Sequence, residues 1–273
     1  MKNILVLGGK GKTGRKVAEH LTAMNYNVRI GSRSETPAFD WDDQSTWAAA
    51  LEGMDAVYIT YQPDLAVPGA KEAIEGFLKQ AKASGIKKAV LLSGKGEAEA
   101  EQCEQILMDS GIAWTVVRAS WFNQNFSEGF FVDSIEAGIV AMPVLNYKVP
   151  FVDTDDIGAV AAKALVEEGH NGEIYELTGA ELLDFKEAVA IISEASGREI
   201  QTQDISNEEY NHMLKELQVP EDYIWLINYL FEVVLTNPDN QQVTADIRKV
   251  LGREPRSFRE YALETFAGKP LTV

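Results

Sequence analysis

The sequence predicts an α/β fold in which a doubly wound parallel sheet is followed by a smaller, mostly helical C-terminal lobe. Three observations support this prediction. The apolar run at residues 4–7 leads into a glycine-rich stretch and then into apolar residues at helical spacing, Val17, Leu21 and Met24. Strand and helix patterns alternate through the first 120 residues, and helical patterns dominate beyond residue 183. Such alternation forms a Rossmann-type sheet, which binds ligands at the carboxyl ends of its strands.

The expected strands are short runs rich in β-branched and other apolar residues, of the kind that is buried in a parallel sheet. They lie at residues 4–7, 27–30, 39–41, 56–60, 88–93, 113–118 and 172–178. Some helix boundaries have local signals: Pro68 suits a first helical turn, and Gly111 suits a C-cap. The expected helices lie at residues 12–24, 44–51, 68–84, 97–109, 154–165, 185–196, 207–217, 221–235, 243–251 and 258–266.

The alternation predicts two domains. Residues 1–180 are expected to form a nucleotide-binding domain, and residues 181–273 a smaller substrate lobe. Residues 121–150 have a looser pattern, and we expect them to line part of the substrate lobe.

The glycines after the first strand are the most specific motif. Gly9-x-Gly11-x-x-Gly14 fits the dinucleotide fingerprint, and Gly8-x-x-Gly11-x-x-Gly14 fits its looser short-chain-reductase variant. Gly11-Lys12-Thr13 resembles the end of a mononucleotide P-loop, but the glycine that such a loop needs five residues earlier is Val6. The alternative is a glycine-rich turn without a ligand. Candidate cofactor-binding residues in this loop are Gly8, Gly11, Lys12, Thr13 and Gly14.

The first 34 residues form a positive region in an acidic chain. They contain seven Lys and Arg residues and one acid, Glu19, for a net charge of +6, whereas the whole chain carries −17. A local excess of positive charge favours a bound anion, although a solvated basic helix face would show the same composition.

The end of the second strand distinguishes NADP from NAD. An acid near this point binds the ribose 2′-hydroxyl of NAD, and an arginine accommodates the 2′-phosphate of NADP. No acid occurs between Glu19 and Glu35, while Ser32 and Arg33 follow the strand directly. Arg33 can fork onto phosphate oxygens, with Ser32 and Lys12 beside it. The sequence therefore favours NADP(H), the alternative being that Arg33 is a surface residue.

Composition excludes several classes of function. A sequence pI near 4.6 argues against nucleic acid as a partner, and no apolar stretch is long enough to span a membrane. The N-terminus is expected to be a buried strand rather than a signal peptide. The single cysteine, Cys103, and three widely separated histidines indicate no metal site. We expect a soluble, cytoplasmic protein whose partner is a small-molecule substrate.

Five segments besides the glycine loop resemble the NmrA-like family, a branch of atypical short-chain dehydrogenase/reductases. The similarity spans nearly the whole chain and is strongest to members that resemble triphenylmethane reductase and festuclavine dehydrogenase. The segments are Phe39-Asp40-Trp41, Leu92-Ser93-Gly94, residues 117–126, residues 150–157 and residues 219–223.

The resemblance implies an NADP(H) site at the ends of the first strands. Asp40 and Trp41 would border the adenine. Thr60, Tyr61 and Gln62 would lie on the ribose and pyrophosphate side, and Ser93 and Gly94 at the nicotinamide.

The chain departs from ordinary short-chain reductases at the catalytic acid. Those enzymes use a Tyr-x-x-x-Lys pair, but no tyrosine here has a lysine four residues later. By alignment the pair falls at Ala100 and Glu104, which can neither protonate an alkoxide nor assist such a step. A plain ketone reductase is therefore disfavoured, and no catalytic residue is assigned.

Hydride transfer without a strong acid suits an acceptor that is already electron-poor, such as an iminium ion, a cationic dye or a quinone-like ring. The predicted substrate pocket consists of Tyr61, Trp121, Phe122 and Asn123. Further aromatic residues either extend this pocket or belong to the core: Phe126, Phe130, Phe131 and Phe151.

Two functional hypotheses follow from the sequence. The favoured one is an NADP(H)-dependent oxidoreductase that transfers hydride to a small conjugated, iminium or quinone-like acceptor. The alternative is a non-catalytic, NADP-binding redox sensor that regulates a protein partner, as some NmrA-like proteins do. A homologue with an inactive pocket is a third, weaker interpretation. The sequence leaves a homodimer or a protein partner open.

Overall fold

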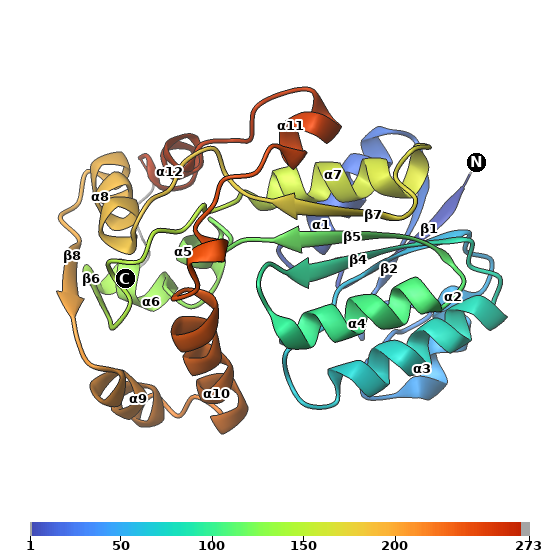
Figure 1. Ribbon diagram of the computed structural model, residues 1–273, viewed down its shortest axis with the longest axis horizontal. Helices are drawn as coiled ribbons and strands as arrows, with labels where there is room; N and C mark the ends of the chain where they lie inside the picture. The colour runs from blue at the N-terminus through green and yellow to red at the C-terminus, as the bar shows by residue number, and fades with distance from the viewer. Residues whose placement is uncertain (1, 269–273) are drawn as a thin grey trace. The chain divides into compact units, whose positions relative to one another are not determined.

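The computed structural model describes residues 2–268, and the chain packs as two compact units (Figure 1). Three chain segments make up the first unit, Met1–Ala119, Thr154–Leu177 and Asp246–Arg253. The second unit consists of Ser120–Asp153, Thr178–Ala245 and Glu254–Val273. The last five residues of the predicted C-terminal lobe lie outside the described residues.

A six-stranded parallel sheet forms the centre of the first unit. Its strand order is β2-β1-β3-β4-β5-β7, and every neighbouring pair is parallel. The strands are β1 (Asn3–Leu7), β2 (Asn27–Gly31), β3 (Ala56–Ile59), β4 (Lys88–Gly94), β5 (Ala113–Ala119) and β7 (Glu173–Leu177). This confirms the predicted doubly wound sheet. The strand order reverses between β1 and β3, where open α/β sheets form a crevice at the carboxyl ends of the strands.

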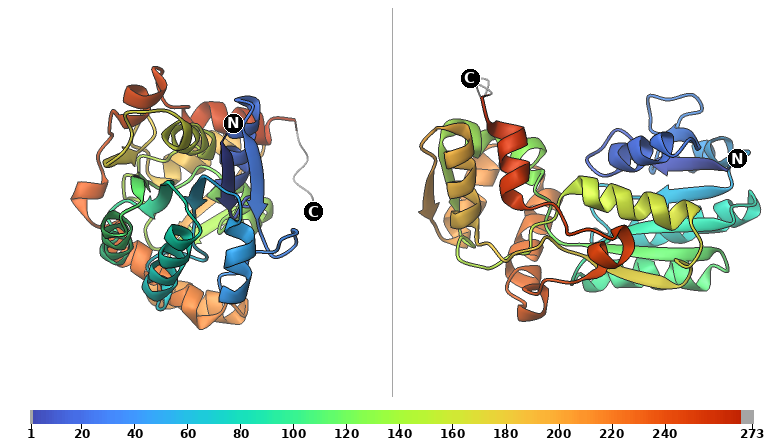
Figure 2. Two further views of the ribbon diagram at one scale, coloured as in Figure 1. Left: turned by 90° about the vertical axis from the view of Figure 1, so that its right-hand side faces the viewer. Right: turned by 90° about the horizontal axis from the view of Figure 1, so that it is seen from above.

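Helices cover both faces of this sheet (Figure 1). One face carries α1 (Gly14–Ala23) and α7 (Thr154–Val166), which lie side by side (Figure 2). A Cβ on Gly158 of α7 would lie 2.6 Å from Lys16 Cβ of α1, so glycine permits this close approach. The opposite face carries α2 (Trp47–Leu51), α3 (Ala70–Ala83) and α4 (Ala98–Asp109), whose apolar side chains share one core with Leu5, Leu7 and Val57.

The second unit surrounds an aromatic core. Phe126, Phe151, Phe185 and Phe258 contact one another there, with ring centroids 5.2–6.3 Å apart. A short parallel pair, β6 with β8, lies in the same unit. Its elements are α5 (Asn125–Glu128), α6 (Val132–Ala137), β6 (Ile139–Met142), α8 (Phe185–Ser196), β8 (Gln201–Asp204), α9 (Asn207–Glu216), α10 (Glu221–Tyr229), the π-helical turn η2 (Leu230–Val234), the 3₁₀ turn η3 (Pro238–Asn240) and α12 (Phe258–Phe266).

The predicted strand at residues 39–41 is wrong. The main chain of Asp40 bonds to side chains instead of a neighbouring strand: its N–H donates to Thr46 Oγ1 at 3.1 Å, and its carbonyl accepts from Trp47 Nε1 at 2.7 Å. The segment is irregular and leads into the 3₁₀ turn η1 (Gln44–Thr46).

The second unit resumes at residue 178 rather than at the predicted residue 181, and the units also differ from the prediction in two longer segments. Residues 120–153 pack into the second unit, and residues 246–253, which include α11 (Asp246–Leu251), pack into the first. Side chains of the latter segment hold it there: Asp246 accepts from the Glu176 N–H at 2.9 Å, and Arg253 pairs with the buried Asp156 at 2.7 Å. Among residues 2–268 we find no helix that is both long and apolar enough to cross a membrane.

Candidate functional site

The glycine loop after β1 forms a tight turn in which backbone groups of the loop contact one another. Gly8 has φ +59°, and its N–H donates to the Gly31 carbonyl at 3.0 Å. The Gly11 N–H donates back to the Gly8 carbonyl at 2.8 Å. A Cβ on Gly14 would lie 2.3 Å from that same carbonyl oxygen, which leaves no room for a side chain. The loop therefore forms a compact backbone cradle whose shape depends on glycine.

The ends of β1 and β3 meet beside this cradle. A Cβ on Gly8 would lie 2.6 Å from Thr60 Cγ2, and one on Gly11 would lie 3.8 Å from Gln62 Nε2. Four of the predicted cofactor residues are thus brought together where the strand order reverses.

The first turn of α1 lacks the usual protein cap. Its N-cap residue Thr13 makes no side-chain capping bond, and no acidic residue occurs in the first turn. By contrast, α8, α9 and α12 each begin with a reciprocal capping box, at Asp184, Ser206 and Ser257. An uncapped helix N-terminus behind a glycine cradle is suited to a phosphate group.

The basic residues of the first 34 positions have mixed roles. Lys10 Nζ lies 2.7 Å from Glu35 Oε1, Lys16 Nζ lies 2.9 Å from Glu19 Oε2, and Arg29 donates to the Ala50 carbonyl at 2.9 Å near the end of α2. These contacts show that part of the positive region stabilises the fold.

Arg33 differs from those residues. It is exposed in the segment after β2 and makes no ion pair or hydrogen bond within residues 2–268. Ser32 lies beside it, and its Oγ lies 3.1 Å from Ser34 Oγ. The guanidinium of Arg33 is therefore available to a ligand.

Trp41 lies at the carboxyl end of β3. Its Nε1 donates to the Thr60 carbonyl at 3.1 Å, and its ring centroid is 5.0 Å from that of Tyr61. Both rings are partly buried and pack against the core of the first unit, which raises the pKa of the Tyr61 hydroxyl by desolvation. Asp40 lies next to Trp41, with its backbone fixed by α2 and η1 as described above.

The end of β4 contains an ion pair that sequence reasoning missed. Ser93 Oγ donates to Glu104 Oε1 at 2.6 Å, and both side chains are buried. Arg118 of β5 holds the same carboxylate through two nitrogens, with an Nη2–Oε2 distance of 2.6 Å. Ala100 is also fully buried. The positions expected for the Tyr-x-x-x-Lys pair therefore contain an alanine in the core and a glutamate in a structural ion pair.

Two further acids near Gly94 were not among the site residues that the sequence analysis predicted. Asp64, between β3 and α3, and Glu97, at the N-cap of α4, share a hydrogen bond between their side chains. Burial raises the pKa of both carboxyls, and for Glu97 the negative charge of Asp64 adds to this effect. The sequence signal was weak: each acid follows the end of one of two neighbouring strands.

Three predicted pocket residues belong to the second unit. Asn123 is completely buried, and neither polar atom of its side chain has a hydrogen-bond partner among residues 2–268. Its backbone N–H donates to the Val152 carbonyl at 2.9 Å. Trp121 is partly buried, and its ring stacks on Phe231 with centroids 5.9 Å apart. The backbone of Phe122 forms an isolated parallel β-bridge with that of Val152. Of the four further aromatics, three are core residues, and Phe130 is 41% exposed.

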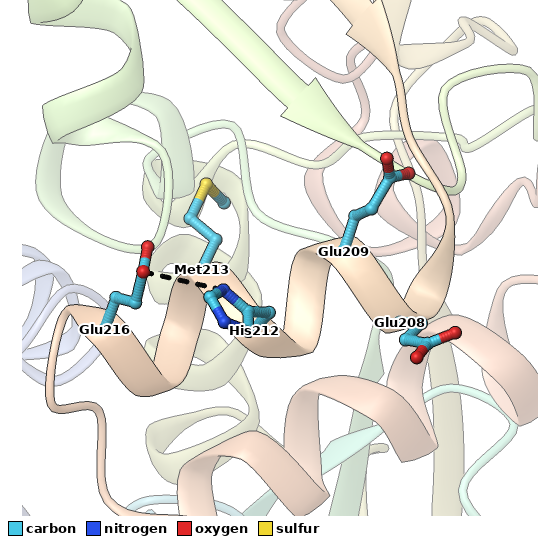
Figure 3. A pocket seen from close by; sticks show the side chains of 5 residues that line it. All are labelled: Glu208, Glu209, His212, Met213 and Glu216. Atoms are coloured by element: carbon cyan, nitrogen blue, oxygen red, sulfur yellow. Dashed lines mark ion pairs between the residues drawn. The ribbon is translucent and has the colours of Figure 1, made fainter.

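A hollow of about 410 Å³ lies elsewhere, on α9 (Figure 3). All five lining residues come from this one helix, and His212 pairs with Glu216 at 3.6 Å. None of the predicted site residues lines it. Within residues 2–268 no group of three or more His, Cys, Asp or Glu side chains could hold a metal ion.

The parallel sheet, its order reversal and its glycine cradle are those of the doubly wound nucleotide-binding class. Within that class the chain belongs to the NmrA-like family, whose model matches residues 1–262.

Relatives of known activity or role cover nearly the whole chain. It is 31% identical to prestalk A differentiation protein A of Dictyostelium discoideum, over 97% of this chain and 93% of that protein. It is 30% identical to an NAD(P)H azoreductase of Xenophilus azovorans, over 95% and 96% of the two chains. It is also 30% identical to festuclavine synthase I of Penicillium roqueforti, again over 95% and 96%.

Solved structures confirm the fold. The NADPH complex of the Escherichia coli quinone oxidoreductase QOR2 superposes with a TM-score of 0.79 at 21% identity, covering 96% of this chain and 99% of that one. Triphenylmethane reductase of Citrobacter sp., complexed with NADP(H), gives 0.76 at 18% identity, covering 97% and 99%. The negative transcriptional regulator NmrA, in complex with NAD, gives 0.71 at 18%, covering 97% and 95%.

Proposed function

We propose that this protein is an NADP(H)-dependent oxidoreductase that reduces a small conjugated, iminium or quinone-like acceptor. Its relatives include proteins named as an NAD(P)H azoreductase and a festuclavine synthase, and its structural neighbours include proteins crystallised with NADPH and NADP(H). When bound, the reduced nicotinamide supplies the hydride. The protein's residues bind the cofactor and orient the acceptor.

The glycine cradle is the observation that carries this proposal. The contact between Gly14 and the Gly8 carbonyl closes the loop, and the first turn of α1 has neither a side-chain cap nor an acid. A diphosphate fits both features, because it needs close backbone approach and accepts hydrogen bonds from a helix N-terminus. Gly8, Gly11, Lys12, Thr13 and Gly14 are the residues proposed to hold it.

Arg33 is proposed to select NADP(H). Its exposed guanidinium has no partner within residues 2–268, and it can fork onto a 2′-phosphate with Ser32 and Lys12 nearby in the sequence. The remaining cofactor contacts are proposed as the resemblance implies. Asp40 and Trp41 would lie at the adenine, Thr60, Tyr61 and Gln62 along the ribose and pyrophosphate, and Ser93 and Gly94 at the nicotinamide.

An Arg33→Ala variant tests this assignment. Loss of a bidentate contact to phosphate costs about 2–3 kcal/mol, so we expect the Kd for NADPH to rise about 30- to 150-fold, whereas the Kd for NADH stays within about twofold. The measurement is a fluorescence titration with each cofactor. Lys87→Ala is the matched control, because Lys87 is an exposed cation just before β4, at the opposite end of the strand. An equal loss for NADH and NADPH would contradict the role of Arg33.

The acceptor is proposed to contact Trp121, Phe122 and Asn123 of the second unit. Asn123 offers an amide donor and an acceptor that lack partners in the described part of the chain, and Trp121 offers an aromatic face. A flat, electron-poor molecule with one polar group fits this chemistry. A screen of NADPH oxidation with quinones, azo dyes, iminium ions and triarylmethyl cations tests it. Tight NADPH binding without turnover of any acceptor would contradict the enzymatic function.

The state of the Tyr-x-x-x-Lys positions favours a second candidate, a redox sensor that binds NADP and regulates a protein. Glu104 is tied to Arg118 and Ser93, so it cannot serve as the usual acid. A sensor is expected to bind the oxidised and reduced cofactors with very different affinities and to couple that difference to a protein partner. Equal affinities together with turnover would exclude it.

A further inference from the structure

Asp64 and Glu97 form a buried carboxyl pair at the ends of β3 and β4. Asp64 Oδ1 accepts from the Ala66 N–H at 2.8 Å, and its side chain also bonds to Glu97. Glu97 is only 6% exposed, and its Oε2 has no hydrogen-bond partner within the residues that the structure describes. The same carboxyl lies directly over Gly94, where a Cβ would come within 1.9 Å of Oε1. The pair thus lies beside the residue proposed to contact the nicotinamide.

The negative charges around Glu97 favour the protonated form of the Asp64–Glu97 carboxyl pair. The groups that act on it are Asp64, from the β3–α3 segment, and Glu99 and Glu104, from α4, all of them acids. The neighbouring cation, Lys95, is paired with a glutamate of β7, with an Nζ–Oε2 distance of 3.3 Å. Burial and these negative charges raise the pKa of Glu97 well above its usual value. Two buried carboxyls that share a hydrogen bond hold one proton between them, and they titrate as a pair.

Other groups at this edge are less suited to give up a proton. Both oxygens of Glu104 accept hydrogen bonds from Arg118, and the Ser93 hydroxyl donates a further hydrogen bond to the same group. Tyr61 is the remaining rival, because its phenol also lies at the end of β3, but burial raises its pKa above that of a free tyrosine and weakens it as an acid.

We propose that the carboxyl of Glu97, held by Asp64, donates the proton to the acceptor as it is reduced, in place of the tyrosine that the chain lacks. This role rests on the proposed oxidoreductase function.

The step balances as one hydride and one proton. When bound, the reduced nicotinamide would supply a hydride, which would bring two electrons to one atom of the acceptor and make a conjugated oxygen or nitrogen atom basic. The O–H bond of Glu97 breaks as an O–H or N–H bond forms on that atom. Glu97 is left as a carboxylate beside Asp64, and water returns the proton to the pair. A cationic acceptor needs no proton, because hydride alone neutralises it.

This difference between acceptors gives the test. We compare NADPH-dependent reduction of menadione, a quinone that needs the proton, with reduction of malachite green, a triarylmethyl cation that does not. Glu97→Gln is expected to lower kcat for menadione about 100-fold and to leave kcat for malachite green within about threefold. Glu101→Gln is the matched control, an exposed acid of the same helix, and is expected to change neither.

The pH profile tests the pair as a unit. In the wild type, kcat for menadione should fall as pH rises through the ionisation of the pair. Asp64→Asn removes a negative charge beside Glu97, so the fall should move to lower pH. An unmoved profile in Asp64→Asn would overturn the coupling between the two acids.

Infrared difference spectroscopy gives a readout that is independent of turnover. The wild type at neutral pH should show the C=O band of a protonated carboxyl that Glu97→Gln lacks, and its absence overturns the proposal. An equal loss for both acceptors in Glu97→Gln, or a selective loss for menadione in Tyr61→Phe instead, also overturns it. A wild type that binds NADPH but reduces neither acceptor overturns the oxidoreductase function itself, and the proton role with it, whatever the infrared band shows.

Discussion

Gly14→Ala probes the cradle on which the cofactor proposal depends. The new Cβ would lie 2.3 Å from the Gly8 carbonyl oxygen, 2.6 Å from the Gly8 carbonyl carbon and 3.0 Å from Gly9 Cα. All three atoms belong to the backbone, so no side-chain rotation relieves the contact. Ordinary contact begins near 3.4 Å, and the loop must therefore retreat from α1 by about 1 Å.

The magnitude follows from that displacement. Forcing backbone apart in a packed region costs about 2–3 kcal/mol, which for a chain of this size lowers Tm by about 5–10 °C. A shift of about 1 Å also removes two charge-assisted hydrogen bonds to a phosphate, worth about 3 kcal/mol, so the Kd for NADPH should rise about 150-fold.

Thermal unfolding and fluorescence titration measure the two effects. Gly76→Ala is the matched control, since Gly76 lies inside α3 and a Cβ there would meet the Trp47 ring at an ordinary 3.4 Å. Alanine in a helix interior gains up to about 1 kcal/mol, so this variant should keep or raise Tm and bind NADPH normally. If Gly14→Ala binds NADPH as tightly as the wild type, the phosphate does not lie in the cradle.

Two further predictions concern stability. The hydrogen bond to Asp155, at 3.2 Å, raises the pKa of His20, so its stabilisation is present below pH 6.5 and is lost as pH rises through the raised value. His20→Ala should therefore cost up to about 1 kcal/mol at pH 6 and little at pH 9 in chemical denaturation, whereas the exposed His212→Ala should have no effect at either pH. Glu104→Gln leaves Arg118 without its buried partner and should lower the free energy of unfolding by about 3 kcal/mol. Replacing both residues by Met should restore most of that stability. A loss below about 1 kcal/mol in Glu104→Gln would contradict a structural role for the pair.

Local signals explain which elements the sequence predicted well. The helix at residues 185–196 matches α8, and 258–266 matches α12, because each begins with a capping box that is readable from the sequence. The six strands of the sheet were predicted because buried parallel strands are apolar runs. By contrast, β8 is the polar sequence Gln201–Asp204 and is mostly exposed, so no pattern marked it.

The residues at 39–41 show how tertiary contacts override a strand pattern. Phe39 and Trp41 alternate with a polar residue, as a strand would, but both rings are drawn into the aromatic core with Trp47 and Phe77. Without this strand, β2 is the edge of the sheet. The glycine cradle could be predicted because it depends on residues next to each other in sequence. The network at Ser93 could not be predicted in the same way, because its members are distant in sequence. Ser93 bonds to Glu104 of α4, which in turn accepts from Arg118 of β5.

The two glutamates near the start of α4 show how environment separates roles for one residue type. Glu104 faces Arg118, so its charge is neutralised inside the sheet edge and its oxygens are occupied. Glu97 lies seven residues earlier in the sequence, faces another acid and has an oxygen without a partner. The first arrangement pairs a buried acid with a cation and contributes to the fold. The second raises the pKa of a buried carboxyl next to Gly94, because burial and the neighbouring acids both disfavour its charged form. Carboxyls whose environments differ in this way are typical of acid–base sites, and this contrast is the reason that we propose Glu97 as the proton donor.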